Sequence, residues 1–155
     1  MMKKIFLFII ILNLLNSCGF SPLHSNKSNA NFSIEEVKYE GDKIINNFLK
    51  NYFRVLKNNE YENSYKINVN TEYYKNVLSK DSTAEIIDYQ LTTKVLFQIS
   101  LKDKIIKELR FVEKQNMNSI SDKFEEQKYE RVIKENFAST IFDKLISELT
   151  SLNDN

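Results

Sequence analysis

Alternation of apolar and polar residues predicts β-strands in four segments of the chain. The clearest strand covers residues 89–101, where Tyr, Leu, Thr, Val, Phe, Ile and Leu occupy seven alternate positions and mostly polar residues lie between them. Such alternation is typical of a sheet with one buried face and one wet face. The same pattern, less regular, predicts strands over 32–40, 65–78 and 105–114.

A helical period of apolar residues predicts two helices. The first covers 42–57, directly after Gly41, with Asp42 as its N-cap. The second runs from Asp122 to about residue 150, and Asp122 with Glu125 resembles a capping box. Its apolar stripe contains Tyr129, Ile133, Phe137, Ile141, Leu145 and Leu149, widened by Val132, Ala138, Phe142 and Ile146.

The expected order is strand, helix, three strands, helix, with connections at 79–83, 102–104 and 116–121. Two helices with one apolar face each can cover the apolar face of one sheet. The fold class is therefore α+β: a two-layer sandwich of a four-stranded, mostly antiparallel sheet with two helices on one face. We expect a single domain over 32–150 and a tail over 151–155.

The first 17 residues have the pattern of a lipoprotein signal peptide. Lys3 and Lys4 precede an apolar run from Ile5 to Leu15, which is shorter than the ~20 residues of a membrane-spanning helix. The run ends in Leu-Asn-Ser before Cys18, the single cysteine of the chain. This site resembles the bacterial lipobox, which implies N-acyl and S-diacylglycerol groups on Cys18. An ordinary secretory signal with a chance cysteine is the alternative.

We expect residues 18–31, of which 21–31 are largely polar, to form a lipidated tether. In the lipoprotein class, Asp after the lipidated Cys often signals retention in the inner membrane, whereas Gly19 stands there in this chain. We therefore expect the lipid anchor to lie in the inner leaflet of the outer membrane, with the domain on the periplasmic face. Several acyl chains hold a protein firmly to a bilayer.

Composition excludes several classes of function. With 22 Lys and Arg against 21 Asp and Glu, the chain lacks the basic surplus of a nucleic-acid-binding protein. Two Gly, one Cys and one His leave too few residues for a phosphate loop, a cysteine-based zinc site or a multi-His metal site. His24 lies six residues after Cys18, and Glu125 with Glu126 suits a helix N-terminus. We expect no enzymatic activity, no metal and no cofactor beyond the lipid.

Three features together resemble the LptE family of lipopolysaccharide-assembly lipoproteins. The mature start, Cys-Gly-Phe at 18–20 followed by Leu23, is similar to the start of that family. Thr83-Ala84-Glu85 and Tyr89-Gln90-Leu91 resemble its central hairpin, with Ile86-Ile87-Asp88 inserted between them. The final helix and the order of elements are also similar, so the resemblance covers nearly all of the mature chain.

The resemblance implies a function as well as a fold. A member of this family plugs the outer-membrane β-barrel LptD, supports its assembly and assists insertion of lipopolysaccharide into the outer leaflet, without catalysing a reaction. The implied partners are an LptD-like barrel and lipopolysaccharide. Two other interpretations stay open: a stand-alone periplasmic lipoprotein that binds lipid or a small ligand, and an assembly factor for other outer-membrane proteins. A ligand carrier requires an apolar cavity between helices and sheet.

The expected topology suggests one binding site. It places Lys43, Lys80, Lys114 and Lys123 at the end of the domain opposite the lipidated start, where they could meet phosphates or carboxylates. In the family, basic residues near the matching hairpin tip and last helix are linked to lipopolysaccharide, which points to Lys80 and Lys123. Ordinary solvated lysines at loop ends are the alternative.

Overall fold

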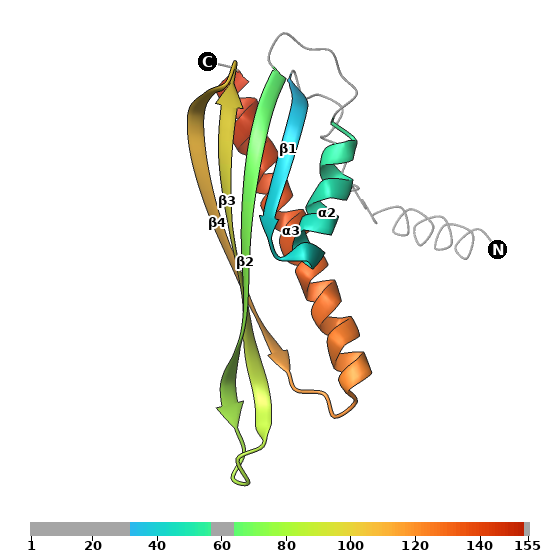
Figure 1. The fold of residues 1–155 in the computed structure, drawn as a ribbon. Helices are drawn as coiled ribbons and strands as arrows, with labels where there is room; N and C mark the ends of the chain where they lie inside the picture. Colours follow the sequence, from blue (N-terminus) through green and yellow to red (C-terminus); the bar gives the residue numbers. More distant parts are fainter. Residues whose placement is uncertain (1–31, 57–63, 154–155) are drawn as a thin grey trace, which may run out of the picture. The chain divides into compact units, whose positions relative to one another are not determined.

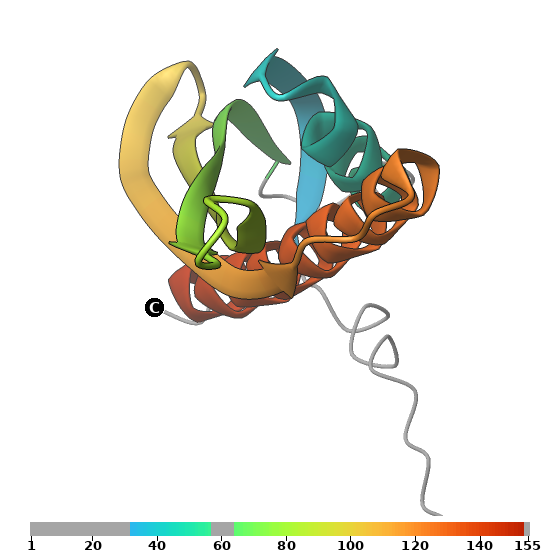
Figure 2. The same cartoon turned by 90° about the horizontal axis from the view of Figure 1, so that it is seen from below.

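The computed structural model describes residues 32–56 and 64–153. Four strands form one sheet, and two helices cover one of its faces (Figures 1 and 2). This confirms the predicted α+β class and the predicted order of elements. The elements are β1 (Ser33–Gly41), α2 (Lys43–Arg54), β2 (Ser64–Lys80), β3 (Ile86–Leu101), β4 (Lys104–Asn118) and α3 (Lys123–Asn153).

The strands lie in chain order, β1-β2-β3-β4, and only the first pair is parallel. The parallel pair requires a crossover, and α2 supplies it. β2 pairs with β3 from Tyr65 opposite Leu101 to Lys80 opposite Ile86, so these two strands form a long hairpin. β1 pairs only with the first half of β2 and ends with Gly41 opposite Thr71.

The turn from β1 into α2 is fixed by two residues. Gly41 has φ +92°, a conformation that side chains disfavour. Asp42 then caps the helix as predicted, because its Oδ1 accepts the N–H groups of Ile44 at 3.0 Å and Ile45 at 2.9 Å. Its own N–H donates to the Thr71 carbonyl at 3.0 Å, which ties the turn to β2.

Aromatic rings fill the centre of the core. The centroid of Phe53 lies 5.1 Å from that of Phe142, 6.5 Å from Phe97 and 6.3 Å from Tyr39. These rings come from α2, α3, β3 and β1, so all of these elements meet there. The alternate residues of β3 predicted to face the core are buried between Leu91 and Ile99, as expected.

The predicted stripe on α3 is confirmed in its second half, where Ile133, Phe137, Ile141, Leu145 and Leu149 are buried. Its first half differs, because Tyr129 and Val132 are exposed. The helix also continues to Asn153, so the residues expected to begin a tail at 151 extend the last helical turn instead.

Several predicted boundaries need correction. The polar loop expected at 116–121 is wrong, since β4 continues to Asn118 and Met117 is buried opposite Tyr89. The hairpin turn lies at 81–85 rather than 79–83, and Asp81 Oδ1 accepts the N–H groups of Thr83 and Glu85 there. α2 ends at Arg54 rather than residue 57.

The predicted signal peptide (1–17) and tether (18–31), including Cys18 and His24, lie outside the described residues. Residues 154–155 of the predicted tail lie outside them as well. Within 32–56 and 64–153, neither helix is long and apolar enough to cross a bilayer.

Candidate binding surfaces

A chain of ion pairs joins β2 to the first half of α3. The Nζ of Lys75 lies 2.9 Å from Glu126 Oε1 and 2.9 Å from Glu130 Oε2. Lys75 occupies a core-facing position of β2, two residues beyond Tyr73. Since Glu126 and Glu130 are one helical turn apart, one lysine reaches both. These charges lie beside a buried apolar cluster of Leu91, Met117, Ile133 and Phe137, which joins the same part of the sheet to α3.

The same network of ion pairs continues toward α2 through Lys134. Its Nζ lies 3.1 Å from Asp42 Oδ2 and 3.9 Å from Glu130 Oε1, and 3.6 Å from the centre of the Tyr73 ring. The Tyr73 hydroxyl donates to Glu130 Oε1 at 2.9 Å. Burial, together with this bond to a carboxylate, raises the pKa of Tyr73. Asp42 thus caps α2 with one oxygen and binds α3 with the other.

Glu126 is the most enclosed acid of this network, with 6% of its side chain exposed. Its Oε2 accepts the N–H of Ile120 at 3.1 Å and lies 3.3 Å from the Nζ of Lys123. Burial alone raises the pKa of Glu126, but the bonds from Lys75, Ile120 and Lys123 outweigh it and lower the pKa to about 2. Glu126 is therefore ionised at neutral pH and holds the start of α3 on β2.

The structure does not bring the four predicted lysines into one cluster. Lys80 ends β2 beside the hairpin turn, and Lys123 begins α3. Lys123 shares Glu126 with Lys75, and Lys75 precedes Lys80 by about 17 Å of strand at ~3.3 Å per residue. These two lysines thus lie toward the same end of the domain, with Lys123 neutralised in part.

Lys43 and Lys114 lie elsewhere. Lys43 begins α2 next to the end of β1, so the remaining length of β2, about 30 Å, separates it from Lys80. Lys114 pairs in register with Thr92, on the face of the sheet that the helices leave uncovered. The expectation that all four gather at one end is corrected. Lys43 is distant because β1 is far shorter than the hairpin beside it, and Lys114, although level with Tyr74 along the sheet, lies on the face away from the helices.

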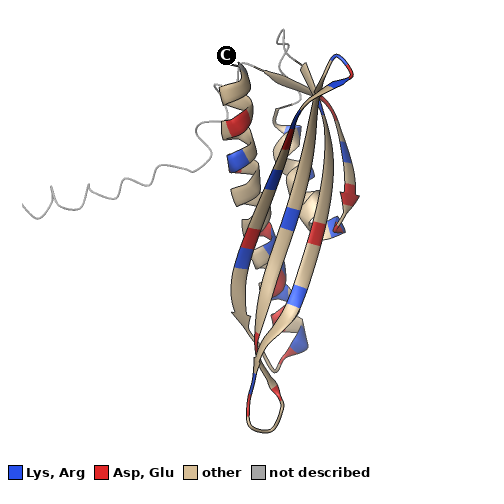
Figure 3. Ribbon diagram, turned by 90° about the vertical axis from the view of Figure 1, so that its left-hand side faces the viewer, with Lys and Arg blue, Asp and Glu red and all other residues tan. Residues whose placement is uncertain are grey.

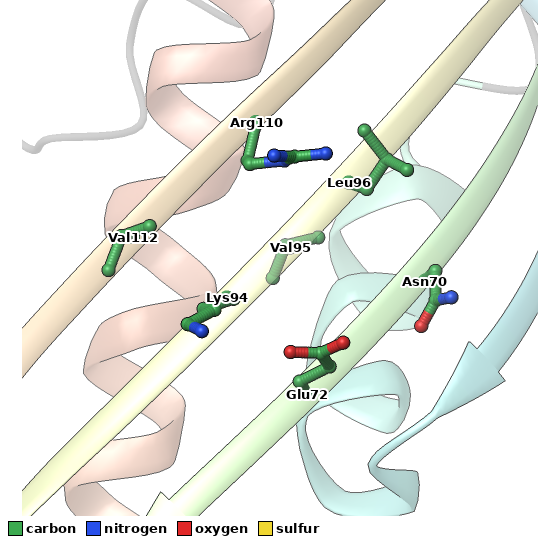
Figure 4. A pocket seen from close by; sticks show the side chains of 7 residues that line it. All are labelled: Asn70, Glu72, Lys94, Val95, Leu96, Arg110 and Val112. Carbon is green, nitrogen blue, oxygen red and sulfur yellow. The ribbon is translucent and has the colours of Figure 1, made fainter.

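The uncovered face of the sheet carries three adjoining grooves. The one in Figure 4 has a volume of about 390 Å³, and Glu72, Lys94 and Arg110 stand around it with Leu96 and Val112. A second groove of about 390 Å³ shares Asn70 and Leu96 with the first, and a third of about 160 Å³ adjoins the second. Figure 3 shows charges of both signs along this face.

The ion-pair network was not predicted, although the sequence contains a pattern that indicates it. Lys75 interrupts the core-facing row of β2, and Glu126, Glu130 and Lys134 follow at four-residue spacing on α3. Such charges at core-facing positions point to pairing across the layers. We interpreted Glu126 as a helix-dipole residue, whereas its carboxylate binds Lys75.

The described part of the chain gives no sign of a metal centre: no group of three His, Cys, Asp or Glu side chains in it is placed to hold an ion. Its polar clusters are pairs of opposite charge, which suit positioning and recognition.

Comparison with known proteins adds information on the fold. No model of a known family and no curated protein matches the sequence. Solved structures of bacterial lipoproteins share the fold. Rare lipoprotein B from Shewanella oneidensis is 12% identical with a TM-score of 0.57, over 76% of this chain and 98% of that one.

Two further structures agree. A minor lipoprotein from Acinetobacter baumannii is 15% identical with a TM-score of 0.51, over 74% of this chain and 94% of that one. An uncharacterized lipoprotein B from Nitrosomonas europaea is 11% identical with a TM-score of 0.50, over 81% of this chain and 88% of that one. The described domain therefore has a fold found in bacterial lipoproteins.

Proposed function

We propose that this protein is a non-enzymatic outer-membrane lipoprotein, anchored through Cys18, that plugs an LptD-like β-barrel and supports its assembly. In this role it assists insertion of lipopolysaccharide into the outer leaflet. The lipobox-like segment before Cys18 and the fold of the lipoprotein neighbours support the anchor and the class. The mature start and hairpin that resemble the LptE family support the partner.

The observation that carries the proposal is the polar, uncovered face of the sheet. The lumen of a large outer-membrane barrel is polar, so a plug inside it needs a polar surface with balanced charges. Lys94 and Arg110 stand opposite Glu72 on this face, around a groove of about 390 Å³. A partner wall that supplies matched charges could cover such a face.

The alternative of a lipid or small-ligand carrier receives less support. Side chains from both layers, such as Phe53, Phe97, Phe142 and Leu145, are fully buried and fill the space where an apolar ligand would lie. The three grooves lie instead on the polar face of the sheet, away from the helices. Lipopolysaccharide contact through Lys80 and Lys123 remains part of the proposal.

Affinity purification from the native membrane tests the proposal. The lipidated protein is expressed in its bacterial host, extracted in mild detergent and recovered with whatever binds it. We expect a large β-barrel in about equal amount, and less lipopolysaccharide at the cell surface after depletion. Cys18→Ala, which cannot be lipidated, is the matched control and should recover much less barrel. A protein recovered without a barrel but with bound lipid would favour the carrier.

Charge reversal tests the lipopolysaccharide contact separately. Lys80→Glu and Lys123→Glu should each weaken binding of lipopolysaccharide to the purified protein. Lys43→Glu, which is about 30 Å from Lys80 along β2, should not. Unchanged binding in the first two variants would remove these residues from the proposal while leaving the barrel partnership in place.

A further inference from the structure

β2 extends well beyond its neighbour β1. The pairing of β1 ends with Gly41 opposite Thr71, whereas β2 continues through Glu72–Lys80 with β3 on its other side (Figure 1). For this second half of β2, the described part of the chain provides no strand on the β1 side. One edge of the hairpin is therefore free over nine residues.

The residues at the end of β1 determine where this strand leaves the sheet. A Cβ on Gly41 would lie 1.8 Å from the Thr71 carbonyl oxygen, so the backbones approach more closely than a side chain allows. Asp42 immediately donates to that carbonyl and begins α2. β1 therefore stops at this point for a specific structural reason, and the edge beyond it stays open.

Backbone direction identifies the groups on this edge. The Thr71 carbonyl points toward β1, because it accepts the N–H of Asp42. In a strand, the N–H and C=O of one residue point to the same side, and successive residues alternate. The backbone groups of Tyr73, Lys75 and Val77 therefore point to the free edge. A row of such groups is a template for another strand.

The edge strand β4 has core-facing charges, Lys107 and Glu113, which bind Glu148 and Lys144 of α3. Lys75 of β2 is bound to α3 in the same way. The edge of β2 differs because its neighbour β1 stops at Gly41, so that half of an otherwise interior strand lacks a partner. On the free edge of β2, the exposed large apolar side chains are Tyr74 at 42%, Val77 at 47% and Leu78 at 49%, and the exposed polar ones are Glu72, Asn76 and Lys80.

Within the edge-directed stretch Tyr73–Val77, Lys75 is the single charged residue. Its Nζ is held by Glu126 and Glu130 on the core side of the sheet, so its charge is paired within the domain. An incoming strand therefore meets a neutralised lysine at this position and not a free positive charge.

We propose that the free edge of β2, centred on Tyr73–Val77, receives an extended segment of the partner protein, which adds as a fifth strand. This inference rests on the proposed function, because the partner is the barrel protein. Main-chain hydrogen bonds provide affinity in this mode, and pockets for alternate side chains provide specificity. The segment should carry apolar residues at the positions that meet Tyr74 on one face and Val77 on the other.

The length of the edge limits how a second copy could bind. A second β2 has 17 residues, and in parallel orientation it would run into Gly41 and α2, because the free stretch ends there. In antiparallel orientation it could pair only over its own nine free residues, and the crosslinking experiment below distinguishes this pairing from a segment of the partner. A separate extended segment of about nine residues or fewer fits between the end of β1 and the hairpin turn.

A proline at an edge-directed position tests the proposal. Alternation from the Thr71 carbonyl directs the N–H of Val77 away from β3, at the last regular pair before the register shift between Val77 and Ser79. Val77→Pro therefore removes a donor needed by the incoming strand and leaves the regular pairing of β2 with β3 in place. Val77→Thr keeps the N–H and the branched side chain and is the matched control. We expect Val77→Pro to lower the barrel recovered from native membranes by about tenfold or more, and Val77→Thr to leave it nearly unchanged.

Two measurements make the result decisive. Thermal unfolding of the purified variants shows whether Val77→Pro is folded, and a photo-crosslinking residue in place of Asn76 probes the edge without proline. We expect an adduct with an extended segment of the barrel protein, and none from a crosslinker in place of Glu135, an exposed residue of α3. An adduct between two copies of this chain would overturn the proposal.

The remaining outcomes separate this inference from the proposed function. Undiminished barrel recovery with folded Val77→Pro, or an Asn76 crosslinker that gives no barrel adduct, would overturn the edge proposal alone. Absence of a barrel from the wild-type purification would overturn both.

Discussion

Replacing Glu126 by Gln should measure how strongly the ion-pair network holds α3 on β2. The side chain is 6% exposed and is bound by Lys75 at 2.9 Å and Lys123 at 3.3 Å. Glutamine has nearly the same shape and can still accept the N–H of Ile120. The substitution therefore removes the charge and leaves the packing largely intact.

The size of the effect follows from the pKa of Glu126. A carboxyl with a pKa of about 2 in the folded protein and about 4.3 unfolded contributes at most ~3 kcal/mol to the free energy of unfolding at neutral pH. Lys75 and Lys123 are 24% and 68% exposed, so solvent screens part of this attraction. We expect Glu126→Gln to cost about 2 kcal/mol, or about 8 °C in Tm.

The contribution of the Glu126 charge to stability should decrease in acid. Because the folded pKa lies below the unfolded one, the contribution is complete above pH ~4.3 and is lost as the pH falls toward 2. The difference in stability between wild type and Glu126→Gln should therefore be largest at pH 7 and shrink toward zero in acid. Urea unfolding at several pH values measures it.

The neighbouring Glu125 provides a matched control. Its carboxylate is 52% exposed and lies 3.5 Å from Lys128, so Glu125→Gln should cost less than about 0.5 kcal/mol. A double-mutant cycle with Lys75→Met should give a coupling of about 1 kcal/mol or more with Glu126→Gln. Equal costs for the two glutamine variants, or a gap that does not change with pH, would show that the Glu126 charge does not hold α3 on β2.

Substitutions at three further positions test other features, each by urea unfolding at pH 7. Gly41→Ala should cost more than about 2 kcal/mol, because its Cβ would lie 1.8 Å from the Thr71 carbonyl oxygen at a positive φ; a neutral result would contradict the close approach. Asp42→Asn should keep the cap of α2 and lose the charge facing Lys134. Asp42→Ala should lose both and reduce the free energy of unfolding by about 1 kcal/mol more than Asp42→Asn does. Equal costs for the two variants would argue against the cap. Thr93→Val should be neutral or stabilising by about 1 kcal/mol, because the buried Thr93 hydroxyl has no hydrogen-bond partner among the described residues; a loss of stability would reveal one.

The layer arrangement could be predicted because its signals are local. Alternation over 89–101 is explained by a strand whose odd-numbered residues from Leu91 to Ile99 are buried. Asp42 after Gly41 identified the start of α2, since both the cap and the positive φ are properties of single residues. The end of β4 was not predicted, because its residues are mostly polar, although Met117 between two asparagines is buried there. Pairing with β3 extends this strand beyond what its own composition favours.

The candidate sites required the register, which the sequence does not contain. Four lysines at loop ends could be placed near one another only by assuming strands of similar length. In the structure β1 has nine residues and β2 has 17, so Lys43 lies far from Lys80. The same difference in length creates the free edge, a feature that no residue type marks.

The charges between β2 and α3 also bear on the choice between plug and carrier. An acyl chain would need an apolar cavity between sheet and helices. In this half of the hairpin, that interface is filled by the packed apolar side chains of Leu91, Met117, Ile133 and Phe137 and by the paired charges of Lys75, Glu126, Glu130 and Lys134. Placing a hydrocarbon beside them would remove solvent from paired charges without replacing their hydrogen bonds, which is costly. The network instead supports a long hairpin beyond the reach of β1 and α2. A rigid hairpin with one open edge suits binding to a protein wall better than enclosure of a lipid, so a variant such as Glu126→Gln that loosens the network should also weaken binding at the edge.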